Sequence, residues 1–241
     1  MKKLFKSILS IIMITVTSTV NAQVGVSQSL SGNQVAIIRI SAVTGKGDLS
    51  KLKAELNAGL DAGLTINQIK EAIVHSYAYA GFPRSLRGLQ TFMSVLDERK
   101  AQGINDITGA EASPVNDQRS KYERGKAILE HLTGVPEKGP KTGYAAFAPV
   151  IEVFLKEHLF ADIFERDILT YAERELITVS VLSGIGGVEP MLRSHLNICL
   201  NVGLTRAQLQ EFVDLIKSSI GKKEGKSAQT VLNELLKSKS L

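Results

Sequence analysis

Two stretches of the 241-residue sequence that lie 140 positions apart align without a gap, LNAGLDAGLTINQIKEA (56–72) and LNICLNVGLTRAQLQEF (196–212). Eight of the seventeen aligned positions are identical. In each stretch, leucines spaced by three or four residues precede a Gly-Leu-Thr corner, and a second helical pattern follows it. The repetition indicates a duplicated helical module and decides the fold class.

Backbone chemistry explains the corner between the two helical patterns. Gly63 and Gly203 are able to adopt the left-handed conformation that ends a helix. Thr65 and Gln68 have the spacing of a capping box, in which the two residues satisfy each other's backbone N–H groups at a helix start. The same spacing recurs from Thr205. Each copy is therefore predicted to contain an αα-hairpin.

The rest of the sequence is helical in pattern as well. Alternating strand patterns are absent, so the sequence predicts an all-α fold built from a duplicated helical bundle. Gly81 and Pro83 are predicted to end the second helix of the first hairpin. Residues 101–116 are rich in Gly, Ser, Asn and Asp and are predicted to link a first module at 23–100 to a second at 117–241.

Residues 1–22 have the layout of a secretory signal peptide. Three lysines near the start precede an apolar run at 8–16, and small residues stand before the boundary at Ala22. The apolar run is too short to span a bilayer. We expect cleavage after Ala22 and export to the periplasm or the exterior, with no membrane attachment afterwards.

Composition argues against several classes of function. Without the three leader lysines, the chain keeps 26 basic and 24 acidic residues, and it has no tryptophan. No basic block is interleaved with aromatic residues, so nucleic-acid binding is not expected. Cys199 is the single cysteine, which excludes an intrachain disulfide. The four histidines lack metal-ligand spacing, and neither a metal nor an organic cofactor is expected.

The candidate site begins with a carboxyl group on an apolar helix. The stretch YAERELITVSVLSGIGG (171–187) is apolar on nearly every face, which predicts a buried helix. Glu175 falls on the same face as Val179 and Leu182. A buried carboxyl group is either paired or has a raised pKa. Glu175 is therefore a candidate general acid, or it pairs with a neighbouring arginine near the helix start.

His195 lies beside a leucine stripe in the next helical pattern, and Cys199 follows four residues later. At this spacing the two side chains are able to touch. A histidine beside a thiol lowers the pKa of the thiol and activates it. A single cysteine on a leucine stripe is also ordinary packing material. His195 is thus either part of the chemistry or a hydrogen-bonded core residue.

The first module contributes HSYAYAGFPRSL (75–86). Glu71, His75 and Tyr79 repeat every four residues, on the side of the helix away from its isoleucine stripe. Such a ladder would shuttle protons or hold an acidic substrate alongside Arg84. Alternatively, it forms a solvated or subunit-facing edge.

These segments resemble the carboxymuconolactone decarboxylase family, which shares its fold with the alkylhydroperoxidase proteins. Residues 173–211 are similar to the family's R-E-L, L-R-x-H and G-L-T run, and residues 56–86 to its H-x-x-x-Y-x-G-x-P run. Residues 143–167 resemble the segment that precedes R-E-L. The resemblance implies an alkylhydroperoxidase-like fold, present once in each module.

The resemblance also implies two activities. The peroxidase branch uses a glutamate, a C-x-x-C pair and a histidine, of which Glu175 and His195 match the outer two. Residues 187–190 stand in the region of the pair and contain no cysteine. The decarboxylase branch also lacks the C-x-x-C pair and is expected to use acid/base chemistry on a lactone acid. The resemblance implies Glu175 and His195 for that role. His75 is expected to join them across the module interface as a further proton carrier.

The leading interpretation is a cofactor-free enzyme acting on a small carboxylate or lactone. Tyr79 would lie beside the substrate, and Arg84 or Arg193 would anchor its negative charge. One alternative is an antioxidant protein of the alkylhydroperoxidase type that uses Cys199 alone. Another is a non-catalytic ligand-binding or scaffold protein. Family members form rings of single modules, so fused modules are expected to assemble as a homotrimer.

Overall fold

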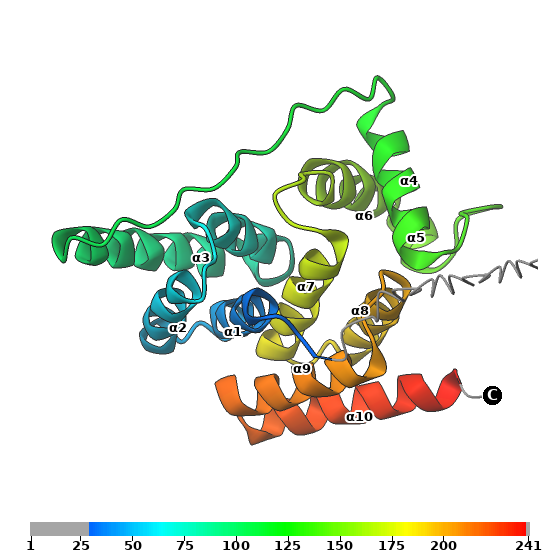
Figure 1. Ribbon diagram of the computed structural model, residues 1–241. Helices are drawn as coiled ribbons and strands as arrows, with labels where there is room; N and C mark the ends of the chain where they lie inside the picture. The colour runs from blue at the N-terminus through cyan, green and yellow to red at the C-terminus, as the bar shows by residue number, and fades with distance from the viewer. Residues whose placement is uncertain (1–28, 240–241) are drawn as a thin grey trace, which may run out of the picture.

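The computed structural model describes residues 29–239 (Figure 1). All the regular secondary structure in this part of the chain is helical and no strand is present, which confirms the all-α prediction. None of its helices is long and apolar enough to cross a membrane. The predicted leader lies outside the described residues. The elements are α1 (Gly32–Lys46), α2 (Leu49–Asp61), α3 (Ile66–Ala101), α4 (Lys121–Thr133), α5 (Gly143–Phe147), α6 (Pro149–Phe154), the π-helix η1 (Leu155–Phe164), α7 (Tyr171–Ile185), α8 (Glu189–Asn201), α9 (Arg206–Ser219) and α10 (Lys222–Ser238).

The two predicted corners have the same geometry. Gly63 between α2 and α3, and Gly203 between α8 and α9, both have φ 98°. The side chain of Thr65 accepts a hydrogen bond from the backbone N–H of Gln68 at the start of α3. Thr205 caps α9 in the same way. Both αα-hairpins are therefore confirmed.

Helix α3 is sharply kinked at Gly81, which has φ 78° and ψ 162°. This backbone break is the one that the Gly-Phe-Pro sequence predicts, but the helix resumes immediately after it and continues to Ala101. The hydroxyl of Ser85 donates to the carbonyl of Ile73 at 2.8 Å, which ties the two halves of α3 together across the kink. The kink keeps Tyr79 and the residues before it packed against the second module.

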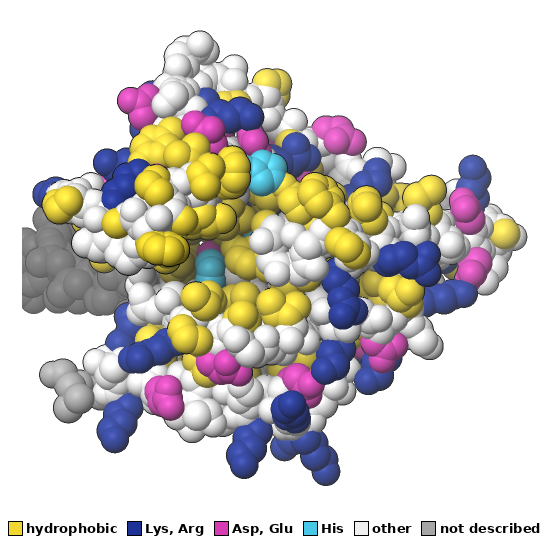
Figure 2. All heavy atoms as spheres, turned by 180° about the vertical axis from the view of Figure 1, so that it is seen from behind, with side chains coloured by type: hydrophobic (Ala, Val, Ile, Leu, Met, Phe, Trp, Pro, Cys, Tyr) yellow, Lys and Arg dark blue, Asp and Glu magenta, His cyan; other side chains and the backbone are white. Residues whose placement is uncertain are grey.

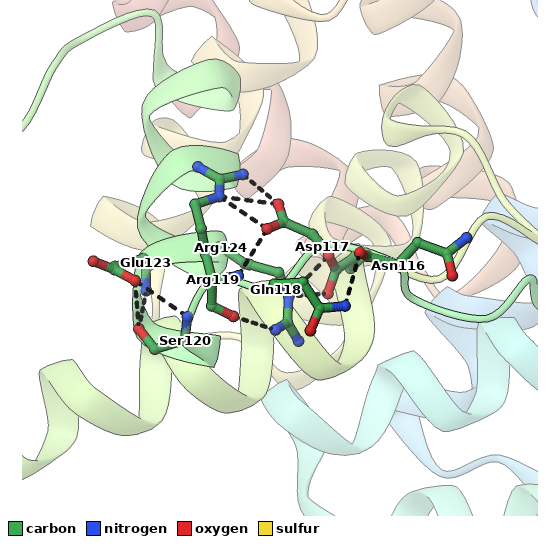
Figure 3. Close-up of polar contacts among 8 residues, drawn as sticks. Asn116, Asp117, Gln118, Arg119, Ser120, Glu123 and Arg124 are labelled. Atoms are coloured by element: carbon green, nitrogen blue, oxygen red, sulfur yellow. Dashed lines mark hydrogen bonds and ion pairs between the residues drawn. The ribbon is translucent and has the colours of Figure 1, made fainter.

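After α3, the chain crosses the molecule without a helix through residues 102–120 (Figure 1). Ser120 and Glu123 form the capping box that starts α4 (Figure 3). Arg124, one residue later, binds Glu165 at the end of η1 with two contacts of 3.0 Å. These contacts fix the position of α4 on the π-helix.

Helix α7 is the central element, because the cores of both modules include it. It contributes Ile177 and Val181 to the cluster built mainly from α1, α2 and α3. In return, α1 contributes Ile38 and Ala42 to the cluster built mainly from α7 to α10. The two modules therefore share their hydrophobic cores along the contact between α1 and α7.

The helices α1 and α7 meet through glycines. A Cβ atom placed on Gly184 would lie 2.6 Å from the carbonyl oxygen of Ala42, and one on Gly45 would lie 2.9 Å from that of Val181. Both distances are too short for a side chain. The glycines therefore permit the close approach that buries α7.

We predict that Gly184→Ala lowers the free energy of unfolding by about 1–3 kcal/mol, because the new methyl group overpacks this contact. An alanine inside a helix otherwise stabilises it by up to about 1 kcal/mol relative to glycine. Gly32→Ala is the matched control, since no atom lies within 4 Å of the added Cβ. Urea unfolding compares the two variants. Equal stability of both would contradict the close contact.

Candidate active site

Helix α7 carries three adjacent polar side chains that are completely buried, those of Arg174, Glu175 and Thr178. The helix starts at a capping box formed by Thr170 and Glu173. Its apolar positions are enclosed on several sides, so the polar side chains cannot reach bulk water. They need partners on the neighbouring helices, and α3 and α8 supply them.

Arg174 forms a buried ion pair with the first module. One of its guanidinium nitrogens donates to Oε1 of Glu71 on α3 at 2.7 Å. The half-exposed Arg166 binds the same carboxylate at 3.0 and 3.1 Å. Burial lowers the pKa of Arg174 below its ordinary value, and the contact with Glu71 opposes this effect. The pair joins α3 to α7 and thereby one module to the other.

His75 lies one turn after Glu71 and is also completely buried. Its Nε2 is 2.9 Å from Oγ1 of Thr178, whose own proton is donated to the carbonyl of Arg174. Nε2 must therefore carry the proton of this contact. Nδ1 faces a guanidinium nitrogen of Arg174 at 3.4 Å and acts as an acceptor, because arginine only donates. These contacts favour the neutral form of His75 in which the proton is on Nε2.

The environment also favours the neutral form of His75. Burial, then the positive charge of Arg174 and the nearby His195, lower the pKa of His75 well below its usual value. A second proton on Nδ1 would place an N–H group against the guanidinium. The predicted ladder is thus neither solvated nor subunit-facing, since it faces α7 inside the molecule.

Glu175 pairs with His195 on α8 and not with an arginine. Nδ1 of His195 lies 2.8 Å from Oε2 of the carboxylate. Glu175 is completely buried, whereas the side chain of His195 is 15% exposed. A carboxylate that accepts from Nδ1 orients the imidazole and leaves Nε2 for proton transfer. Figure 2 shows hydrophobic side chains around a hollow in which one histidine side chain is visible.

Tyr79 lies between the two histidines. Its ring stacks on His75 with centroids 5.6 Å apart and meets His195 edge-on at 5.7 Å. Its hydroxyl and Oε1 of Glu175 are buried without a hydrogen-bond partner among residues 29–239. Burial and the Glu175 carboxylate raise the pKa of the phenol, so Tyr79 stays a neutral donor. The structure therefore brings His75, Tyr79, Glu175 and His195 together.

The two arginines predicted as anion anchors lie elsewhere. Arg84 donates to the carbonyl of Lys46 at 2.6 Å and lines a small surface cavity of about 240 Å³. Arg193 donates to Ser238 at 3.0 Å and lines a separate open cavity of about 820 Å³ bordered by α8 and α10. Neither arginine contacts Glu175 or His195. The buried cation near the site is Arg174, and Glu71 neutralises it.

Cys199 is completely buried in the core that α7 shares with α8. Burial and the nearby carboxylate of Glu175 raise the pKa of the thiol well above its usual value. A reactive cysteine needs the opposite environment. In this structure Cys199 packs as a core residue.

Sequence reasoning missed Arg174 and Thr178. Arg174 stands between two glutamates, which is typical of a solvated helix start. The signal for its burial was nevertheless present, because a helix that is apolar on nearly every face leaves no exposed side for an arginine. In the described part of the chain, no three or more His, Cys, Asp or Glu side chains are grouped to hold a metal ion.

Comparison with known proteins identifies one family. Residues 152–221 match the model of the Carboxymuconolactone decarboxylase family. The matched segment runs from α6 through η1, α7, α8 and α9, and it includes Arg174, Glu175, Thr178 and His195. The resemblance seen in the sequence is confirmed for this segment. Among curated proteins, none matches the chain.

We predict that Glu71→Gln lowers the free energy of unfolding by about 3–5 kcal/mol, because it leaves the Arg174 guanidinium buried without a counter-charge. Glu98→Gln is the control on the same helix. Its half-exposed carboxylate pairs with Lys53 at 2.7 Å, and its loss is expected to cost less than about 1 kcal/mol. Urea unfolding at neutral pH measures both. A Glu71 variant as stable as the control would refute the role of the ion pair.

We also predict a pH effect from His75. Below the ordinary histidine pKa of about 6.5, the unfolded chain binds a proton that the folded chain excludes, so stability falls as the pH falls. Between pH 6.5 and 5.5, the wild type should lose about 1 kcal/mol more than His75→Gln, because the unfolded histidine is half protonated at the start of this window. Unfolding curves at the two pH values measure this difference, since the other histidines contribute to both proteins.

An NMR titration of the wild type gives a second measurement that does not depend on the variant folding. The His75 ring signals should keep the neutral form down to pH 5.5. Protonation of His75 in the folded protein near pH 6.5 would contradict the assignment.

Proposed function

We propose that this protein is an acid/base enzyme that acts on a small lactone or carboxylate. The proposal starts from the match of residues 152–221 to the Carboxymuconolactone decarboxylase family. The single observation that supports this most is the contact of 2.8 Å between Glu175 and His195. A buried carboxylate that holds a partly exposed imidazole is an arrangement suited to proton transfer. The two residues also lie in the matched segment.

In the proposed reaction, Nε2 of His195 takes a proton from a carbon next to a carbonyl group, or returns one to it. The electron pair left on carbon moves onto the carbonyl oxygen. Where that carbon carries a carboxylate instead of a proton to be removed, His195 starts protonated. The C–C bond breaks, its electron pair stays on the carbon and moves onto the carbonyl oxygen, and CO₂ leaves. His195 then delivers its proton to the carbon. Glu175 balances the positive imidazole throughout. This chemistry draws on the protein's own residues.

Tyr79 is proposed as the hydrogen-bond donor to the developing oxyanion. Its buried hydroxyl makes no well-aligned hydrogen bond among the described residues. The nearby Thr178 side chain lowers the pKa of the phenol, but burial and the Glu175 carboxylate raise it more, which keeps the proton on oxygen. His75 stacks on the tyrosine ring and is held neutral by Arg174 and Thr178. We therefore assign His75 a positioning role in place of the proton-carrying role that the sequence suggested.

The charges around the site favour a substrate whose reacting group is neutral, such as a lactone. Arg174 and Arg166 both bind Glu71. Arg84 and Arg193, which were expected to bind a substrate carboxylate, are on other surfaces. A carboxylate would therefore enter the site without a free guanidinium to pair with.

A thiol peroxidase is not favoured, because the thiol of Cys199 is buried and has a raised pKa. A non-catalytic binding protein remains as the second class, since a buried polar site also binds ligands. We further propose that the protein works after export, as the leader-like residues 1–22 suggest.

We predict that catalysis depends on the pair. The test is a screen of small lactones and of carboxylates with a neighbouring carbonyl group, followed by NMR of the products. His195→Gln and Glu175→Gln should each lower turnover about 10²–10⁴-fold, the usual contribution of general acid–base catalysis. Cys199→Ser is the control and should retain turnover, because its thiol takes no part.

Circular dichroism and thermal unfolding must show that the Glu175 and His195 variants remain folded. Unchanged turnover in both variants would refute the proposed mechanism. Ligand binding by the wild type without any product over long incubation would favour the non-catalytic class instead.

A further inference from the structure

Residues 117–165 form a unit of their own beside the candidate site, which we call the α4–η1 unit. It comprises α4, α5, α6 and η1, and its helices stand together at one side of the molecule (Figure 1). Gly125 on α4 lies so close to the carbonyl of Lys156 on η1 that a Cβ atom would overlap it. The buried ammonium group of Lys156 binds Glu152 on α6, and Tyr122 on α4 donates to the same carboxylate at 2.7 Å. These contacts hold the unit together internally.

Both ends of the α4–η1 unit connect to the rest of the chain at one edge. The backbone N–H of Ser113, before the unit, donates to the side chain of Asp167, after it, at 2.9 Å. The side chain of Arg174 binds the carbonyl of Arg166, so the chain is fixed again directly after the unit. Residues 114–119 lie outside any helix. Two adjacent connections of this kind have the geometry of a hinge.

At the opposite end of α4, the unit meets α8 through one side chain. The amide nitrogen of Asn201 donates to the carbonyls of Leu132 at 3.2 Å and Thr133 at 2.9 Å. Within residues 29–239, and apart from contacts at its own two ends, the unit has no other hydrogen bond or ion pair to the remaining helices. Asn201 is exposed, so water competes for both hydrogen bonds. This end of the unit is therefore held weakly.

The other contacts of the α4–η1 unit are made by apolar and aromatic side chains. Phe164 lies against His75 with ring centroids 5.1 Å apart, and Tyr79 packs on the hydrophobic cluster of the unit. Separation of such surfaces leaves no charge buried without a partner. Helices α3 and α7 differ in this respect, because they are joined by the buried ion pair of Glu71 and Arg174. The unit is thus free to move where the two modules are not.

The candidate site requires a movement of this kind. Glu175 is completely buried, the side chain of His195 is 15% exposed, and the hydroxyl of Tyr79 is buried. A substrate reaches all three groups when the structure beside Tyr79 opens, and closure afterwards excludes water from the reaction. We propose that the α4–η1 unit is a lid, hinged where its two ends meet, that opens at Asn201 to admit the substrate. Its role in catalysis rests on the proposed function, whereas the opening itself is a property of the fold.

Distances between two spin labels test the opening in the full chain without any substrate. In the Cys199→Ser background, Lys138→Cys places one label on the unit and Lys226→Cys places another on α10, and both lysines are exposed. Val135 of the unit and Val231 of α10 line the same cavity, so opening lengthens the distance between the labels. Labelled protein is diluted with unlabelled protein, so that pulsed EPR measures distances within one chain. The wild-type distribution should contain a longer distance beside the closed one.

Asn201→Ala should raise the ratio of open to closed molecules about 5-fold, which is the usual effect of losing one hydrogen bond. Asn233→Ala is the matched control, because this exposed asparagine contacts Gln229 on its own helix and should leave the ratio unchanged. Circular dichroism and the melting temperature should show that both variants are folded.

The same closed distance alone in the wild type and in Asn201→Ala would overturn the lid. An equal rise in the Asn233 control would overturn the role of Asn201 in holding it closed. Neither result bears on the proposed function, because no turnover is measured. The Glu175 and His195 variants test that function separately.

Discussion

The guanidinium group of Arg174 is completely buried, and its need for a counter-charge governs how the helices pack around it. A cation removed from water is tolerated only where a carboxylate and further hydrogen bonds compensate it. Glu71 on α3 provides that carboxylate at 2.7 Å, and it belongs to the other module. The second module therefore cannot bury α7 without the first. Helix α7 is thus attached to the first module in two ways, by the ion pair with α3 and by the close glycine contact with α1.

The same constraint organises the candidate site. Arg174 and Glu175 are neighbours in sequence, and helical geometry turns their side chains toward different helices. Arg174 reaches α3 and holds His75 neutral, while Glu175 reaches α8 and orients His195. The ring of Tyr79 packs between His75 and His195 and so connects the contacts of α3 with those of α8. The candidate site is thus built by three helices from both modules, although Glu175 and His195 both come from the second.

The two aligned stretches differ at the positions that contribute to the candidate site. The position aligned with His75 is Leu215, and the position aligned with His195 is Glu55. Glu55 lies near Arg39 at 3.9 Å and is not paired with a histidine. Both hairpins keep the glycine of the corner and the threonine and glutamine of the capping box. The polar residues of the candidate site are not repeated, since His75 and His195 each occur in one copy.

The residue pattern was enough to predict the helical class, the two hairpin corners and the break at Gly81. It also pointed to the candidates Glu175, His195, His75 and Tyr79. The corners and the break follow from the backbone preferences of glycine, proline and capping residues. The site candidates follow from polar residues that stand among apolar neighbours in a helical pattern. The partners of these side chains became visible in the folded chain. Glu71 pairs with Arg174 and Glu175 with His195, whereas Arg84 and Arg193 lie on other surfaces. The physical reason is that periodicity assigns a side chain to one face of a helix, whereas the group that compensates a buried charge there comes from whichever helix packs against that face.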